Sequence, residues 1–394
     1  MQILKDYAAE PYRIFFPMGF LFLVVGIVPW ILWSLGLIDF YPRDLHMHAM
    51  VGGFLVHFAL GFLMTAIPKF TGTTSASLGE TSLALFIATF GLFSCCLSQL
   101  LWAEISSLLL LGFLVFFAFR RFLRRKWNPP PPFLFLPLGF LAGIIGIMLI
   151  ILSRNYPQLN HAGRILFYEA MMLSLIQGVG SRLVPALLGW APLPKIQIET
   201  RVAKNAWSET KTFAVLAFLF ALSYILQSLG FILVGQVLKA IVVCYVAFGK
   251  WKLYRLPREI GALSFGVYLA GWLTLIGVLA PLVPGLSNPH WNHILYLGGF
   301  AFITFFIASR VTLAHGGYDL AVEKKSLNLQ IVAGLVVLSL ILRLWAAIDP
   351  EMFSNALLSA AFVFLISSLI WAFYFIPKMR MPTKSRVMED HKNC

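Results

Sequence analysis

Three histidines lie in one short apolar stretch of the sequence, DLHMHAMVGGFLVHFALGFLMTAIPKFTGT, which runs from Asp44 to Thr73. They are His46, His48 and His57. An imidazole buried in hydrocarbon costs free energy unless a partner binds it. Neutral histidine is a common ligand of haem iron and of copper. The stretch therefore predicts that at least one of these histidines binds a metal.

A helix through this stretch separates the three histidines. His46 and His48 lie about 200° apart on a helical wheel, so they share a face only if the helix begins between them. His48 is therefore the stronger ligand candidate. His57 lies about 180° from His48 and roughly 13 Å deeper, so one metal ion cannot bind both. Gly53 and Gly61, four residues before and after His57, leave a groove that accepts either a flat macrocycle or another helix.

The chain around these histidines is that of a polytopic membrane protein. It has 394 residues, of which 60% are hydrophobic and 12% charged, whereas about a quarter of the residues of a soluble protein are charged. Apolar runs of about 20 residues predict twelve transmembrane helices and an all-α fold. The predicted spans lie near 14–37, 45–68, 78–101, 103–119, 133–153, 162–190, 212–229, 231–248, 261–284, 291–314, 328–347 and 352–376.

Basic residues are concentrated on one side of these spans. Of the 30 lysines and arginines, 23 fall on the side of the N-terminus, 3 on the other side and 4 within spans. This bias predicts that both termini are cytoplasmic. The net charge of +14 therefore indicates topology and contact with the lipid bilayer, and not nucleic-acid binding. No small-residue cleavage site follows the first apolar run, so the first span is expected to be an uncleaved anchor.

The basic segments after spans four, eight and twelve suggest a four-helix unit that is used three times. The second helices of the three units begin with His48, Glu169 and His293, at spacings of 121 and 124 residues. Polar groups at one depth of such a bundle are expected to converge on its interior. The sequence therefore predicts a single integral membrane domain of three pseudo-repeats. The predicted units are 1–127, 128–258 and 259–394.

Two further groups are candidates for proton or metal chemistry. Glu169 is interpreted as the only carboxylate within a span, which makes it a candidate proton relay. His290 and His293 are predicted to lie on one face of span ten near its periplasmic end. There they are either metal ligands or interfacial polar groups.

Four basic residues lie within the predicted spans. Arg182 and Arg310 are either anion clamps, for example for a haem propionate, or side chains that extend to the interface. Lys239 and Arg343 indicate either a polar pathway or a misplaced span edge. The sequence holds no P-loop, no Ser/His/Asp arrangement and no HExxH helix, so hydrolytic activity has no support.

Three segments resemble the NnrS family. They are EPYRIFFPMG (Glu10 to Gly19), HMHAMVGGF (His46 to Phe54) and GFLMTAIPKFTG (Gly61 to Gly72). The resemblance implies a twelve-helix protein of the bacterial inner membrane that contains haem and copper and is linked to the nitric oxide response. The ligand candidates that it implies are His46, His48, His57 and His293. It does not say which of them binds iron and which binds copper.

The third unit departs from the family motif of the first. Residues 305–317, FFIASRVTLAHGG, contain Arg310 and no proline.

The three four-helix arcs are also similar to those of the main subunit of haem-copper oxidases, in which histidines of spans two and ten face a haem. Likeness at the level of the fold supports no activity by itself.

Three classes of function follow. The leading hypothesis is a membrane haem protein, with or without copper, that binds or disposes of nitric oxide or protects metal centres from it, with His48 and His293 facing one haem. The second is a transporter or maturation factor for copper, haem or another small ligand. The third is a redox enzyme acting on nitric oxide, with Glu169 as proton donor. The sequence holds too few histidines at periplasmic depth for two haems and a three-histidine copper.

Overall fold

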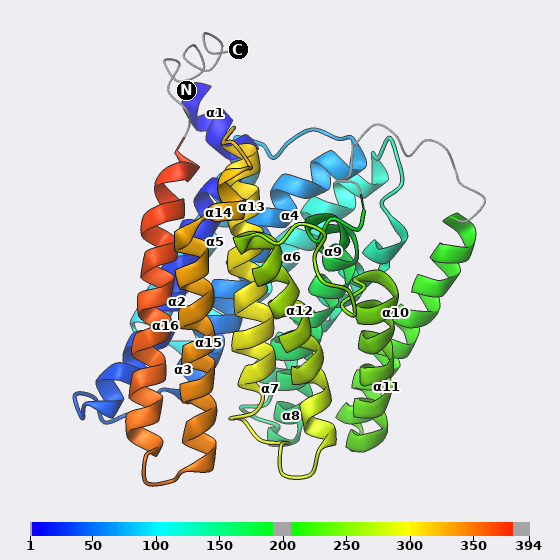
Figure 1. Ribbon diagram of the computed structural model, residues 1–394. Helices are drawn as coiled ribbons and strands as arrows, with labels where there is room; N and C mark the ends of the chain where they lie inside the picture. The colour runs from blue at the N-terminus through cyan, green and yellow to red at the C-terminus, as the bar shows by residue number, and fades with distance from the viewer. Residues whose placement is uncertain (1, 192–205, 381–394) are drawn as a thin grey trace.

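The computed structural model describes residues 2–191 and 206–380, and every regular element within these ranges is helical. Twelve segments of the described part are long and apolar enough to cross a membrane, and they stand side by side in one bundle (Figure 1). The first helix, Gln2–Ala9, and the end of the twelfth span lie at the same end of this bundle. We call this end the terminal face and the other end the opposite face.

The helical elements are α1 (Gln2–Ala9), α2 (Tyr12–Ser34), α3 (Arg43–His48), η1 (Ala49–Leu55), α4 (Val56–Thr71), α5 (Leu78–Cys96), α6 (Leu100–Leu123), η2 (Pro131–Leu134), α7 (Phe135–Leu152), η3 (Pro157–Leu159), α8 (Asn160–Arg164), η4 (Ile165–Ala170), α9 (Met171–Leu187), α10 (Ala206–Ser228), α11 (Ile232–Cys244), η5 (Tyr245–Lys250), α12 (Ala262–Leu279), η6 (Ala280–Leu282), η7 (Ile294–Ala301), α13 (Phe302–His315), α14 (Val322–Lys325), α15 (Leu327–Ile348), α16 (Phe353–Phe375) and η8 (Ile376–Met379). The all-α fold and the twelve spans confirm the sequence prediction, and the span ends differ from the predicted ones by about five residues at most.

Three of the twelve spans lie at the centre of the bundle. They are the second (Arg43–Thr71), the sixth (Pro157–Leu187) and the tenth (Ile294–His315). Their most apolar windows are buried to 78%, 67% and 78%, and no other span in the described part exceeds 56%. A helix that is apolar all round is typical of a bundle interior. The second and tenth spans also carry or adjoin the candidate histidines, and the sixth carries Glu169.

Each central span contains a π-helical segment near the opposite face. These segments are η1, η4 and η7. A π turn holds one residue more than an α turn, so it rotates all later side chains by about 100° relative to a continuous α-helix. Such insertions are frequent at functional sites. Three π segments in three central spans do not test the repeat boundaries, and the three-unit organisation stays a prediction.

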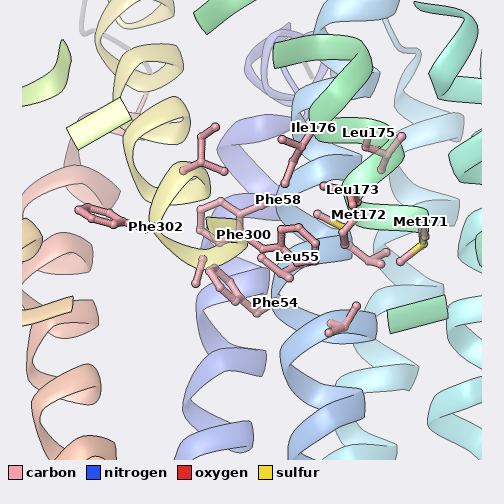
Figure 2. Close-up of a cluster of buried hydrophobic side chains, with 14 of the residues drawn as sticks. Phe54, Leu55, Phe58, Met171, Met172, Leu173, Leu175, Ile176, Phe300 and Phe302 are labelled. Carbon is pink, nitrogen blue, oxygen red and sulfur yellow. The ribbon is translucent and has the colours of Figure 1, made fainter. Parts of the chain in front are cut away.

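The central spans meet in an apolar core, which Figure 2 shows. Phe54 comes from the second span, Met172 from the sixth and Phe300 from the tenth, and all three are buried. The ring of Phe54 lies 5.0 Å from that of Phe58 in an edge-on contact and 5.5 Å from that of Phe305. Aromatic pairs of this kind add stabilisation beyond the area they bury. The core therefore fixes the depth of the central spans relative to one another.

Polar side chains from three distant segments meet at the terminal face. Glu10 forms an ion pair with Arg13 at 2.6 Å and lies 3.4 Å from Nδ1 of His315. Nζ of Lys69 lies 3.1 Å from the same nitrogen. The nearly buried Arg13 also donates to the carbonyl of Met379 at 2.8 Å. Three segments of the sequence are thus joined at one place: EPYR (10–13), IPK (67–69) and AHGG (314–317).

The Glu10 carboxylate is expected to stabilise this junction only while it is charged. Burial raises its pKa, but His315 and Arg13 outweigh burial and hold the pKa below its ordinary value of 4.5. The stability that such a group contributes is present above that ordinary value and is lost as the pH falls through the lowered one. We expect Glu10→Gln to lower the unfolding temperature at neutral pH and to have little effect near pH 3. Thermal unfolding in detergent checks this, and equal losses at the two pH values would contradict it.

Candidate functional site

His46 lies in α3 at the opposite face and contacts the first span. Its Nδ1 is 2.9 Å from the carbonyl oxygen of Gly26. A carbonyl only accepts hydrogen bonds, so Nδ1 carries the proton and Nε2 keeps its lone pair. The ring of Trp30 packs edge-on at 5.9 Å, and Tyr41 packs edge-on against Trp30. His46 therefore lies in aromatic surroundings, and in its neutral form Nε2 is the nitrogen that could bind a metal.

His293 directly precedes the tenth span and has the same hydrogen-bond arrangement. Its Nδ1 lies 2.8 Å from the carbonyl oxygen of Pro289, so this ring too keeps the lone pair of Nε2. The ring interacts electrostatically with those of His46 and His290 and with the guanidinium of Arg343. Two histidines that lie far apart in the sequence are thus brought together at the opposite face.

His290 lies in the turn before the tenth span and not on its helix, which begins at Ile294. Nη1 of Arg343 donates to Nδ1 of His290 at 2.6 Å. Burial lowers the pKa of His290, and the positive charge of Arg343 lowers it further. In this neutral ring the proton is on Nε2, so the ring offers no free lone pair in this arrangement. The interaction with Arg343 therefore disfavours His290 as a ligand.

His48 is buried at the end of α3, away from the partners of His293. Its Nε2 lies 3.2 Å from the hydroxyl of Ser107, and its buried Nδ1 has no hydrogen-bond partner. The ring stacks on Phe167 of η4 with centroids 6.0 Å apart. A Cβ at Gly52 would lie 2.9 Å from Cε1 of His48, so a larger residue there would force this ring to shift. The predicted pairing of His48 with His293 across one haem stays a prediction.

His57 is buried against the first span. Its Nδ1 lies 2.6 Å from the carbonyl oxygen of Gly53, its Nε2 has no partner, and its ring stacks on Phe22 at 4.4 Å. The angle of about 180° between His48 and His57 assumed a continuous α-helix and is wrong. The extra residue of η1 reduces it to about 80°. The two imidazoles are close enough to interact electrostatically.

Glu169 lies in η4 and is held by two partners from neighbouring spans. The hydroxyl of Tyr224 donates to its Oε1 at 3.0 Å, and the ammonium group of Lys239 forms an ion pair with the same oxygen. Only 2% of the Lys239 side chain and 17% of the Glu169 side chain are exposed. Lys239 therefore belongs to the interior of α11 and not to a misplaced span edge. Arg343 likewise lies within α15.

Glu169 is not the only carboxylate within a span, and that interpretation is corrected here. Glu104 lies in α6 with 2% of its side chain exposed, and it forms an ion pair with Arg154 at 2.6 Å. It precedes Ser107, the partner of His48, by one helical turn, so both project from the same face of α6. The segment WAEISS, polar within an apolar run, is the sequence signal that could have identified both residues.

The two arginines proposed as anion clamps lie toward the terminal face. Arg310 forms an ion pair with Glu323, which occupies the guanidinium with a carboxylate of the chain itself. Arg310 also lines a cavity of about 340 Å³ in which Lys324 pairs with Glu259 at 2.5 Å. Arg182 lies half-buried in α9. The anion-clamp function of both arginines stays a prediction.

The donor atoms define what kind of metal site the described residues fit. Residues 2–191 and 206–380 contain no group of three or more histidines, cysteines or carboxylates arranged to bind a metal ion. They do contain imidazoles whose Nδ1 is fixed by a backbone carbonyl, an arrangement that is common among metal-binding histidines. These imidazoles are His46, His57 and His293. Each of these three imidazoles, when neutral, leaves Nε2 as the nitrogen that could bind a metal.

Comparison with known proteins identifies the family. The family model described as NnrS protein matches residues 6–382, which is nearly the whole chain. No match was found among the curated proteins. The three segments that resemble the family (Glu10 to Gly19, His46 to Phe54 and Gly61 to Gly72) all fall within the matched range. The chain therefore belongs to the NnrS family, whose members are membrane proteins associated with the nitric oxide response.

Proposed function

We propose that this protein is a membrane metalloprotein of the nitric oxide response that binds haem or copper through histidines at the opposite face. His46 and His293 are the proposed ligand pair, and His48 and His57 are reserve candidates. We further propose that it lies in a bacterial inner membrane with the terminal face in the cytoplasm. The excess of lysine and arginine on that side, 23 of 30, supports this orientation.

The observation that carries the proposal is the shared arrangement of His46 and His293. Both rings direct the Nδ1 proton to a backbone carbonyl, which leaves Nε2 as the donor atom. Burial lowers the pKa of His293, which lies outside the spans, and the positive charge of Arg343 lowers it further. A neutral imidazole is the form that binds a metal. The surroundings of His293 therefore favour its ligand form.

A haem iron or copper ion held by these histidines would supply electron exchange, or binding of a diatomic gas if one ligand position stayed open. The residues of the chain provide the rest of the site. The backbone carbonyls of Gly26 and Pro289 fix the two rings in place. Trp30 packs edge-on against the ring of His46, and Arg343 provides a positive charge that would pair with an acidic substituent of a cofactor.

The test is the metal content and the absorption spectrum of purified variants. We expect His46→Ala and His293→Ala each to lower the affinity for the bound metal by about tenfold or more, because each removes a ligand. A haem would be detected by its Soret band and copper by elemental analysis. The matched control is His161→Ala, since His161 is exposed in α8. Full metal content in both ligand variants, with correctly inserted protein, would disprove the assignment.

A second candidate function is transport or maturation of copper, haem or another small ligand. The ion pair between Glu169 and Lys239 favours it, because buried charges within membrane spans mark substrate or proton pathways. Flux of the metal into proteoliposomes that depends on Glu169 would support transport. Metal that stays bound at a fixed ratio through purification, without flux, would favour the resident metal site.

A further inference from the structure

A cavity of about 90 Å³ lies where the three central spans meet. Its walls come from the second, sixth and tenth spans, with Phe16 of the first span closing one side. Leu55, Phe58 and Met172, which Figure 2 shows at the junction of these spans, form part of the wall. The cavity begins about 10 Å deeper than His48, because Leu55 follows that histidine by seven residues.

The three central spans face the cavity at matching positions. Phe62, Leu183 and Ile307 all line it. Each lies 14 residues after the position that begins its predicted repeat helix (48 to 62, 169 to 183 and 293 to 307). The following residue of each span, Leu63, Val184 or Ala308, lines the cavity as well. The cavity is therefore built by equivalent faces of three helices and is not a local packing defect between two side chains.

The lining excludes water as a stable occupant. Thr304 is the only lining residue with a polar side chain. Its hydroxyl already donates to the carbonyl of Phe300 at 2.6 Å. A buried water needs two to four polar partners, and an apolar cavity that lacks them stays dry and binds apolar guests. An empty cavity costs stability in proportion to its volume, so an apolar guest would recover contacts that the lining lacks.

We propose that this cavity is a binding site for a small uncharged apolar molecule. A volume of about 90 Å³ accepts a dissolved gas or a molecule of the size of a small hydrocarbon, since a single water needs roughly 10–15 Å³ by the same measure. Charged ligands are excluded because the lining offers no ionic partner. The site is separate from the proposed metal site and does not depend on it.

Xenon is the probe that tests this site, because it binds apolar cavities through dispersion contacts alone. We expect purified protein in lipid nanodiscs to show a bound-xenon signal by ¹²⁹Xe NMR. Ala59→Phe should abolish that signal, because Ala59 lines the cavity and a phenyl group would fill it. The matched control is Ala118→Phe, which adds the same group to a half-buried alanine of α6 outside the cavity. Ala59→Leu fills the cavity less and serves if the phenylalanine variant does not fold.

The possible results are distinct. Xenon binding that is lost in the Ala59 variants and kept in Ala118→Phe supports the proposal. No bound xenon in the unaltered protein, or equal signals in all variants, overturns it. A lipid that copurifies with the unaltered protein and not with Ala59→Phe also overturns it, in favour of an acyl chain as the occupant. Xenon binding that persists in His46→Ala and His293→Ala shows that this site stands even if the metal assignment fails.

Discussion

Replacement of Lys239 by methionine is expected to destabilise the protein by about 3–5 kcal/mol, the cost of leaving a buried charge unpaired. Lys239 is 2% exposed, and its ammonium group forms an ion pair with Glu169. After the substitution the carboxylate keeps only the hydroxyl of Tyr224 as a partner. It would then have to accept a proton or draw water into the bundle, and either response costs free energy. SDS-induced unfolding in mixed micelles measures this loss.

The double variant separates the unpaired charge from lost packing. In Glu169→Gln with Lys239→Met, the charge is removed together with its partner, and we expect most of the lost stability to return. The control is Lys250→Met, because Lys250 forms a more exposed pair with Glu209 and should contribute less than about 1 kcal/mol. If the double variant is no more stable than Lys239→Met, the loss comes from the shape of the lysine side chain and not from its charge.

The number and order of the spans could be predicted because hydropathy depends only on local composition. The contacts that each span makes with the others could not be predicted. The sequence places both Glu169 and Lys239 within spans, but no sequence pattern indicates that they meet, since η4 and α11 come together only through the packing of the bundle. Glu104 does not stand out in hydropathy because it is a single carboxylate near the start of the apolar α6, and its pairing with Arg154 depends on the adjacent α7.

The π-helical segments explain why the histidine geometry was harder to predict than the fold. A helical wheel assumes 3.6 residues per turn, and one inserted residue in η1 moves His57 by about a quarter of a turn or more relative to His48. Hydrophobic periodicity does not reveal such an insertion when the helix is apolar all round. The proximity of His46 to His293 also depends on the approach of distant spans, which no local pattern encodes.

Replacing a glycine that packs on a π segment is expected to have the second large effect on stability. A Cβ at Gly277 of α12 would lie 2.5 Å from the backbone nitrogen of Leu295 in η7. Because the obstructing atom belongs to the backbone, a rotamer change cannot relieve the clash, and α12 and η7 must separate. We expect Gly277→Ala to cost at least about 1–3 kcal/mol, as overpacking does. Leu295 is two residues after His293, so the separation should also move that ring away from His46.

The comparison of two glycines distinguishes a local from a general effect. Gly146 of α7 packs in the same way on η4, where a Cβ would lie 2.4 Å from the nitrogen of Phe167. Gly146→Ala should destabilise the protein to a similar extent, but η4 carries neither His46 nor His293, so metal bound by that pair should be retained. Gly112→Ala in α6 meets no atom within 4 Å and should be neutral or slightly stabilising.

Metal content and unfolding of these three variants, measured together, check whether the close approach of α12 positions the histidine pair. Metal loss in Gly277→Ala alone, with stability lost in both Gly277→Ala and Gly146→Ala, is the expected result. Equal metal loss in the two would mean that the ligands respond to any loosening of the bundle. Unchanged metal in Gly277→Ala, despite lower stability, would mean that His293 does not hold the metal, because Gly277 acts on η7 directly.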